Sequence, residues 1–108
     1  MQTLIQVVCR KGPSLRDRIA KHARIGLYSL SVVKQKQPGR QHGWTKLEST
    51  QPDRRGVINI AWDAHTSVLI CRVITKRGNR PNLIIGDFVD YLLGHFKGRI
   101  EAINIVRR

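Results

Sequence analysis

Residues 57–76 read VINIAWDAHTSVLICRVITK, and this stretch decides the fold. Two runs rich in β-branched residues, 57–62 and 66–76, flank the short connection Asp63-Ala64-His65. Such runs predict strands, and so tight a connection between them predicts a β-hairpin. The second run has apolar side chains at both odd and even positions, which predicts a strand that is central in its sheet or covered on both faces.

Further strands are predicted on both sides of this hairpin. Residues 4–9 are apolar on both faces and predict a central strand. Residues 27–36 alternate and predict a strand whose end emerges into solvent, and residues 42–49 predict a weaker strand that returns from a turn at 37–40. Residues 99–106 predict the last strand.

Two helices complete the predicted elements. The first runs from the capping residue Ser14 to about Arg24, with Gly26 placed to end it, and the second runs from Asn82 to Gly98. Their apolar stripes have helical spacing. The stripes are Leu15, Ile19 and Ala23 in the first helix, and Ile85, Phe88, Val89, Leu92 and Phe96 in the second.

The element order is strand, helix, four strands, helix, strand. This order predicts a single α+β domain over residues 1–108, in which two helices pack on an antiparallel or mixed sheet of five to six strands. By analogy only, the order resembles the split β-α-β arrangement of ferredoxin-like domains with an added hairpin. A fold of this kind does not specify a function.

The chain is strongly basic, with twenty Lys and Arg, seven Asp and Glu, and a formal net charge of +13. A charge of this size opposes compaction, and it favours a polyanionic partner, most often nucleic acid. Residues 1–56 carry a net +9 and residues 57–108 a net +4. We therefore expect the basic surface to come mainly from the first half, and we expect its cations to share one continuous face.

A nucleic-acid-binding surface is predicted from a cationic face of the first helix and from a basic hairpin at residues 34–46, with basic loops beside them. The cations would contact phosphates, and Trp44 would stack on a base. The alternative for Trp44 is a ring folded back onto the sheet. The residues expected to contact nucleic acid are Arg16, Lys21, Arg24, Lys34, Lys36, Arg40, Trp44, Lys46, Arg54, Arg55, Lys76, Arg77 and Arg80.

A second function stays open, that of a protein–protein or small-ligand-binding module. Its charge would serve solubility or would meet an acidic protein partner. Apolar faces left over on the strands also leave a homodimer open. A ligand cavity would be lined by residues such as Tyr28, Trp62, Phe88 and Tyr91.

A third function is that of a small metal-dependent nuclease, which needs carboxylates that hold a metal at the scissile phosphate. It would require two or more of Asp53, Asp63, Asp87 and Asp90 to converge near the basic face. The sequence contains no phosphate-binding loop pattern, and no His or Cys spacing typical of a zinc site. We therefore favour a non-enzymatic protein with no cofactor and no bound metal.

Cys9 and Cys71 lie in apolar stretches and form no Cys-x-x-Cys pair, which predicts two buried, reduced thiols and a cytoplasmic location. No apolar run approaches the ~20 residues of a membrane span. Residues 1–8 lack the basic start and the long apolar run of a secretory signal. We therefore expect no association with a membrane.

Overall fold

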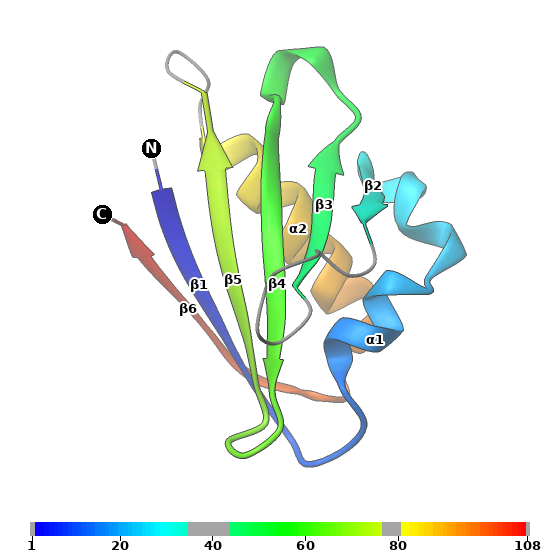
Figure 1. Cartoon of the computed structure of the whole chain (residues 1–108), viewed down its shortest axis with the longest axis vertical. Helices are drawn as coiled ribbons and strands as arrows, with labels where there is room; N and C mark the ends of the chain where they lie inside the picture. Colours follow the sequence, from blue (N-terminus) through cyan, green and yellow to red (C-terminus); the bar gives the residue numbers. More distant parts are fainter. Residues whose placement is uncertain (1, 35–43, 77–80, 108) are drawn as a thin grey trace.

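The computed structural model describes residues 2–34, 44–76 and 81–107. Six strands form one sheet in the order β2-β3-β4-β5-β1-β6, and every neighbouring pair is antiparallel (Figure 1). The strands are β1 (Gln2–Cys9), β2 (Leu30–Lys34), β3 (Thr45–Ser49), β4 (Gly56–Asp63), β5 (Val68–Thr75) and β6 (Ile100–Arg107). The predicted α+β class and its sheet are confirmed.

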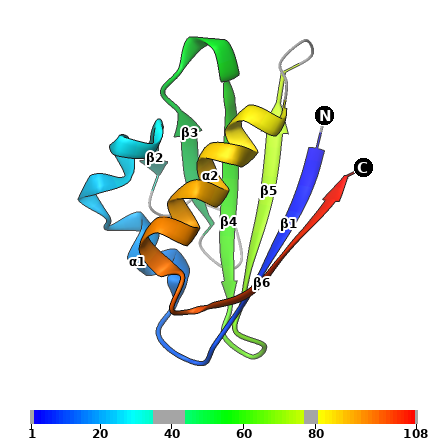
Figure 2. The same cartoon turned by 180° about the vertical axis from the view of Figure 1, so that it is seen from behind.

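The helices lie on one face of the sheet. They are α1 (Leu15–Ala20) and α2 (Pro81–Phe96), with two short 3-10 helices, η1 (Ala23–Tyr28) and η2 (Pro52–Arg54). Figure 2 shows α2 crossing the strands diagonally from the end of β5 toward α1. In Figure 1 the sheet is seen from its other face, in front of α2, and no described helix covers that face.

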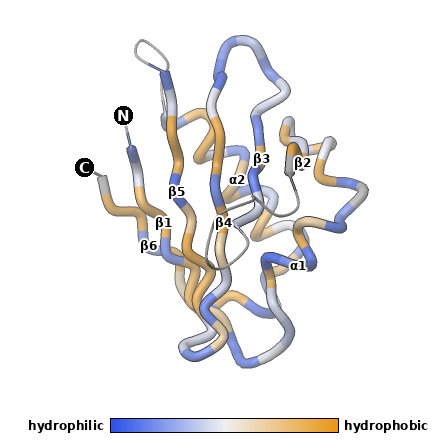
Figure 3. Tube along the Cα trace, viewed as in Figure 1, coloured by the Kyte–Doolittle hydropathy of each residue, from blue (hydrophilic) through white to orange (hydrophobic). Residues whose placement is uncertain are grey.

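The core lies between the helices and the sheet, because every second residue of the central strands points to the helices. These residues include Ile5 and Val7 of β1, Leu47 of β3, Ile58 and Ile60 of β4, and Leu69, Cys71 and Val73 of β5, all fully buried. The helix side of the core is formed by Phe88, Tyr91 and Leu92 of α2, which are also fully buried. Figure 3 shows the hydrophobic residues concentrated along β5 and β6, and hydrophilic residues around the β3–β4 connection.

Several local predictions are confirmed. β4 and β5 form the predicted hairpin, in which the Asp63 carboxylate accepts a hydrogen bond of 3.0 Å from the backbone N–H of His65. β1 and β5 are central strands, since each pairs on both sides. The hydroxyl of Ser14 caps α1 by accepting a hydrogen bond of 3.2 Å from the backbone N–H of Asp17. Cys9 and Cys71 are free thiols and both are buried.

The first helix is shorter than predicted. α1 ends at Ala20, and His22 has an extended backbone before η1 begins. In a continuous helix, Ile25 would lie about 120° around the axis from Ile19 and would face away from the sheet. The break turns Ile25 inward, where only 5% of it is exposed. Burial of Ile25 is therefore the physical reason that the helix stops early.

The strand predicted from residue 27 also begins later, at Leu30. Tyr28 belongs to η1, and Ser29 has a left-handed backbone with φ of 63° that redirects the chain into β2. The strand predicted over residues 42–49 is observed as Thr45–Ser49, and residues 35–43 lie outside the described part of the chain.

The buried stripe of α2 is rotated from the predicted one. Ile84 and Tyr91 are fully buried, whereas Ile85 and Val89 are only half-buried. Ile85 and Val89 instead line a groove of about 640 Å³ beside β6. The apolar periodicity predicted that α2 is a helix. Because Ile84 and Ile85 are both apolar, it did not determine which of them faces the sheet.

The analogy with a ferredoxin-like domain extends to the element order and no further. A β-α-β unit joins two parallel strands through a crossover helix. Here β1 pairs antiparallel with both β5 and β6, and β2 to β5 form an antiparallel meander. The described sheet therefore contains no parallel pair of strands.

Candidate nucleic-acid interface

The face of the sheet that the described helices leave uncovered, here named the open face, is built from the outward-pointing residues of the strands. Its central row is set by the strand register, which places one residue from each of five strands directly opposite the next. This row is Lys46, Asn59, Arg72, Leu4 and Val106, from β3, β4, β5, β1 and β6. Two cations, an amide and two aliphatic side chains thus lie in one line across the sheet.

A second row runs parallel to the first. It consists of Ala61, Ile70, Gln6 and Asn104, from β4, β5, β1 and β6. Trp44 lies at the start of this row, two residues before Lys46 and therefore on the same side of β3. The row combines an aromatic ring, aliphatic side chains and two amides.

Trp44 is the one aromatic residue among the described residues of these two rows. The guanidinium carbon of Arg72 lies 5.9 Å from the centroid of its ring, within cation–π range. Trp44 also borders a hollow of about 440 Å³ together with Ala61 and Ile70. The ring is half-buried, so it rests on the sheet and still presents surface to solvent. The ring thus lies against the sheet, as in the alternative interpretation, and its stacking on a base stays a prediction.

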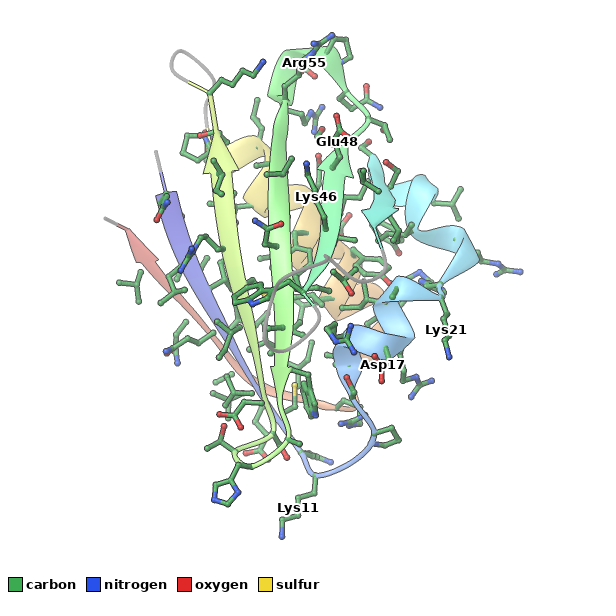
Figure 4. All side chains as sticks on the ribbon, viewed as in Figure 1. Lys11, Asp17, Lys21, Lys46, Glu48 and Arg55 are labelled. Atoms are coloured by element: carbon green, nitrogen blue, oxygen red, sulfur yellow. The ribbon has the colours of Figure 1, made fainter. Side chains whose placement is uncertain are left out.

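Two further cations stand at one end of the open face. Arg55 precedes β4 and Lys76 follows β5, and both are exposed. They line a hollow of about 250 Å³ that also includes Glu48 and Ile74. Figure 4 shows Arg55 and Glu48 near this end of the sheet and Lys46 farther along β3.

The acidic residues lie at the two ends of this surface. Among the described open-face residues of β1, β3, β4 and β5, the acidic ones are Glu48 and Asp63, in the rows on either side of the two just described. Hydrogen bonds from the Thr66 hydroxyl, and then from the backbone N–H of His65, lower the pKa of Asp63. The two central rows carry the positive charges of Lys46 and Arg72 without an acidic residue between them.

Other predicted contact residues lie away from the open face. Lys21 follows α1 and Arg24 lies in η1, and both are exposed. Figure 4 places Lys21 beside α1, at the side of the sheet, and Lys11 at the lower tip of the molecule. The described cations therefore lie on several sides, and the expectation of one continuous cationic face is wrong for this part of the chain.

Two of the predicted arginines are engaged within the protein. Arg16 forms an ion pair with Asp17 and donates a hydrogen bond of 3.3 Å to the hydroxyl of Thr45, and its side chain is only 12% exposed. Arg54 joins η2 to α2 through Asp87, with an Nη1–Oδ1 distance of 3.0 Å. We therefore leave both out of the surface argued below.

Four predicted residues lie outside the described part of the chain, and so does the side chain of a fifth. The four are Lys36, Arg40, Arg77 and Arg80, and the fifth is Lys34, at the end of β2. Their contribution to a nucleic-acid-binding surface stays a prediction.

The carboxylates proposed for a nuclease do not share one place. Asp53 and Asp87 both contact Arg54, whereas Asp63 lies in the β4–β5 turn. Within residues 2–34, 44–76 and 81–107, no three His, Cys, Asp or Glu side chains are grouped so that they could hold a metal ion. Two residues suggested for a ligand cavity, Phe88 and Tyr91, are fully buried in the core.

Sequence reasoning missed a cluster of rings where η1 meets α2. The Nδ1 atom of His22 lies 2.9 Å from the Tyr91 hydroxyl, and the His22 and His95 rings are 4.6 Å apart. Tyr28 and Phe96 complete the cluster. The spacing of Tyr91 and His95, one helical turn apart, was the available signal.

Burial controls the ionisation of this cluster. Burial, followed by the charges of His95, Arg24 and Arg18, lowers the pKa of His22. Burial also raises the pKa of Tyr91. The Tyr91 hydroxyl therefore stays protonated and can donate its hydrogen to Nδ1 of a neutral His22.

Comparison with protein-family models, with curated proteins and with solved structures found no match for this chain. No helix in the described ranges combines the length and the apolar character needed to cross a membrane.

Proposed function

We propose that the protein binds single-stranded nucleic acid on the open face of its sheet, without catalysis. The observation that carries the proposal is the grouping of Trp44, Arg72 and Lys46 on that face. A half-buried aromatic ring on a sheet still offers its accessible surface as a stacking partner to any base, and neighbouring cations attract the phosphates.

The other side chains of the two rows fit the same ligand. Asn59, Gln6 and Asn104 carry amides that can donate to or accept from base edges and sugar hydroxyls. Leu4 and Ile70 give the apolar surface on which unstacked bases can lie. Arg55 and Lys76 would extend the path of the phosphates to the end of the sheet.

The position of Trp44 favours a single strand over a duplex. Its ring rests on the sheet beside Ala61 and Ile70 and does not project from the molecule. A base has to leave its stack and turn toward the sheet to reach such a ring, and a duplex keeps its bases stacked and paired. Single strands make their bases available at little cost.

A cytoplasmic location is part of the proposal, supported by the two free, buried thiols at Cys9 and Cys71. Burial raises the pKa of both thiols, which makes them poor nucleophiles.

The decisive experiment compares two lysines at different places, Lys46 half-buried on the open face and Lys21 exposed beside α1. Fluorescence anisotropy with a labelled single-stranded oligonucleotide would be measured for Lys46→Ala on the open face and for Lys21→Ala beside α1. Both variants lose one positive charge, so a general electrostatic attraction would weaken equally. We expect Lys46→Ala to weaken binding clearly more than Lys21→Ala.

The stacking role of Trp44 is measured in the same assay. Trp44→Ala should weaken binding by ~1–3 kcal/mol, which is the usual range for one base–aromatic stack, and Trp44→Phe should retain most of the affinity. A duplex probe should bind more weakly than the single strand at 0.15 M salt. Equal losses for the two lysine variants, with none for Trp44→Ala, would refute the proposal and favour a protein-binding module.

A further inference from the structure

We infer that two copies of this chain associate through their β6 strands, so that the two sheets join edge to edge. The inference does not depend on nucleic-acid binding. It rests on the free edge of β6, on the apolar side chains beside that edge and on the charges at the two ends of the strand.

The outer edge of β6 offers a regular template for strand pairing from Ala102 onward. β6 ends the sheet, and no other strand of the described residues pairs with its outer side. It is eight residues long, Ile100–Arg107, and contains no proline. A register shift lies near its start, where Glu101 has no partner on β1, and the pairing is regular from Ala102 to Arg107. Proteins usually shield such an edge with short strands, bulges, charges or proline. The opposite edge, β2, is only five residues long and its register shift lies near its end, so it offers a much shorter regular stretch.

The direction of the backbone groups of β6 follows from the register. The N–H of Cys9 donates to the carbonyl of Ser67 on the β5 side, so the backbone groups of Val8, Gln6 and Leu4 turn to β6. Their partners on β6 are Ala102, Asn104 and Val106. The N–H and C=O groups of Ile103 and Ile105 therefore point outward along the free edge.

Apolar surface lies on both sides of this edge. Ile105, on the helix side, is 48% exposed, and Val106, on the open face, is 44% exposed. Ile105 also lines the groove of about 640 Å³, together with Ile85 and Val89 of α2. Figure 2 shows the C-terminal part of β6 standing clear of α2. A stable dimer buries roughly 800 Å² on each partner, so strand pairing has to be joined by burial of such side chains.

A register centred on Asn104 pairs the regular stretch 102–106 of the two copies. If Asn104 of one copy faces Asn104 of the other across a two-fold axis, Ile103 pairs with Ile105 of the second copy through their outward backbone groups. Glu101 of one copy, at the register shift, and Arg107 of the other then lie toward the same end of the joined strands, and the two-fold axis repeats this arrangement at the other end. Opposite charges at the two ends of the strand favour this antiparallel association.

A register-specific disulfide tests the inference directly. In the proposed register the two copies of Asn104 form a pair without direct backbone hydrogen bonds, with Cα atoms about 4.5 Å apart, which suits a disulfide. Mild oxidation of Asn104→Cys should give a covalent dimer on a non-reducing gel. The matched control is Ala102→Cys. This cysteine would face Val106 of the second copy, so the variant should run as a monomer on the same gel. The native Cys9 and Cys71 are buried and should not compete.

Sedimentation measurements without nucleic acid give an independent test. The unmodified chain should show a concentration-dependent mass approaching twice 12.4 kDa. Ile105→Lys should be monomeric, whereas Val33→Lys, at a similarly exposed position of β2, should still dimerise. A monomeric native chain at every concentration, or equal behaviour of the two lysine variants, would overturn the inference.

If Ile105→Lys fails to fold, hydrogen exchange measured on the native chain tests the inference instead. The outward amides of Ile103 and Ile105 should be protected at high protein concentration and should exchange faster on dilution. Exchange that does not change with concentration would also overturn the inference.

Because the two-fold axis is perpendicular to the joined sheet, the two open faces would lie on the same side.

Discussion

At the scale of single residues, two glycines of α2 have opposite surroundings. A Cβ atom added at Gly86 would meet no atom within 4 Å, whereas one added at Gly94 would lie 2.6 Å from the Tyr28 hydroxyl oxygen. Glycine weakens both positions of the helix, but only Gly94 allows Tyr28 to approach α2. The same substitution should therefore have different effects at the two positions.

We expect Gly86→Ala to raise the free energy of unfolding by about 0.5–1 kcal/mol, because alanine is the better helix former. Gly94→Ala should bring a smaller gain or a loss. In a Tyr28→Phe background the nearest remaining atom is the ring Cζ at 3.4 Å, so Gly94→Ala should become more favourable there. Urea unfolding at low protein concentration checks this, since Gly86 also borders the groove beside β6. Identical effects at the two glycines would contradict the packing described.

At the scale of elements, His22 joins the segment between α1 and η1 to α2. Its Nδ1 accepts the hydrogen of the Tyr91 hydroxyl only while the imidazole is neutral. The charged groups around it are His95 on α2, Arg18 on α1 and Arg24 on η1, and all of them disfavour a further positive charge. Protonation of His22 should therefore loosen the contact between these elements.

The pH dependence has a definite sign. The pKa of His22 in the folded protein lies below its ordinary value of 6.5, so on acidification the unfolded chain takes up this proton first. The His22 contribution to stability is then complete above pH 6.5 and is lost as the pH falls through the folded pKa. Urea midpoints at successive pH values should decrease in this window, and His22→Asn should flatten the decrease. An NMR pKa for His22 at or above 6.5 would contradict the prediction.

The strands could be predicted more completely than the helices. Each strand run, as in residues 57–76, carries its own alternation, and the hairpin connection is local, so the pattern sufficed. The end of α1 depends on burying Ile25 against residues distant in sequence, and no local signal marks it. The rotation of α2 likewise depends on which of Ile84 and Ile85 meets the sheet.

At the scale of the whole molecule, a net charge of +13 makes the folded chain repel itself. At 0.15 M salt the Debye length is about 8 Å, so repulsion between distant cations is largely screened. We expect the urea midpoint to rise from very low salt to 0.15 M. A single-stranded oligonucleotide should raise it further at constant ionic strength, because a ligand of the folded state stabilises that state. A midpoint that falls with added salt would show that attractive ion pairs outweigh the repulsion.

The candidate site could be predicted only in part, because composition gives the amount of charge and not its place. The sequence indicated Trp44 and Lys46, but Arg72 drew no attention inside an apolar run. Only the register of β3, β4 and β5 brings these three together. The sequence predicts Arg16 and Arg54 as surface cations. In the structure, Arg16 donates a hydrogen bond to Thr45 and Arg54 donates one to Asp87, so both connect elements of the same chain.

The order of the strands has a consequence for biosynthesis. β1 leaves the ribosome well before its two neighbours, β5 and β6, so Thr3 can pair with Val73 and Arg107 only after these later residues have been made. Pairings between such distant parts of a chain close large loops and slow folding. Until they form, a nascent chain presents the aliphatic side chains of β1 without cover. We therefore expect co-translational chaperones to bind this segment before the sheet forms.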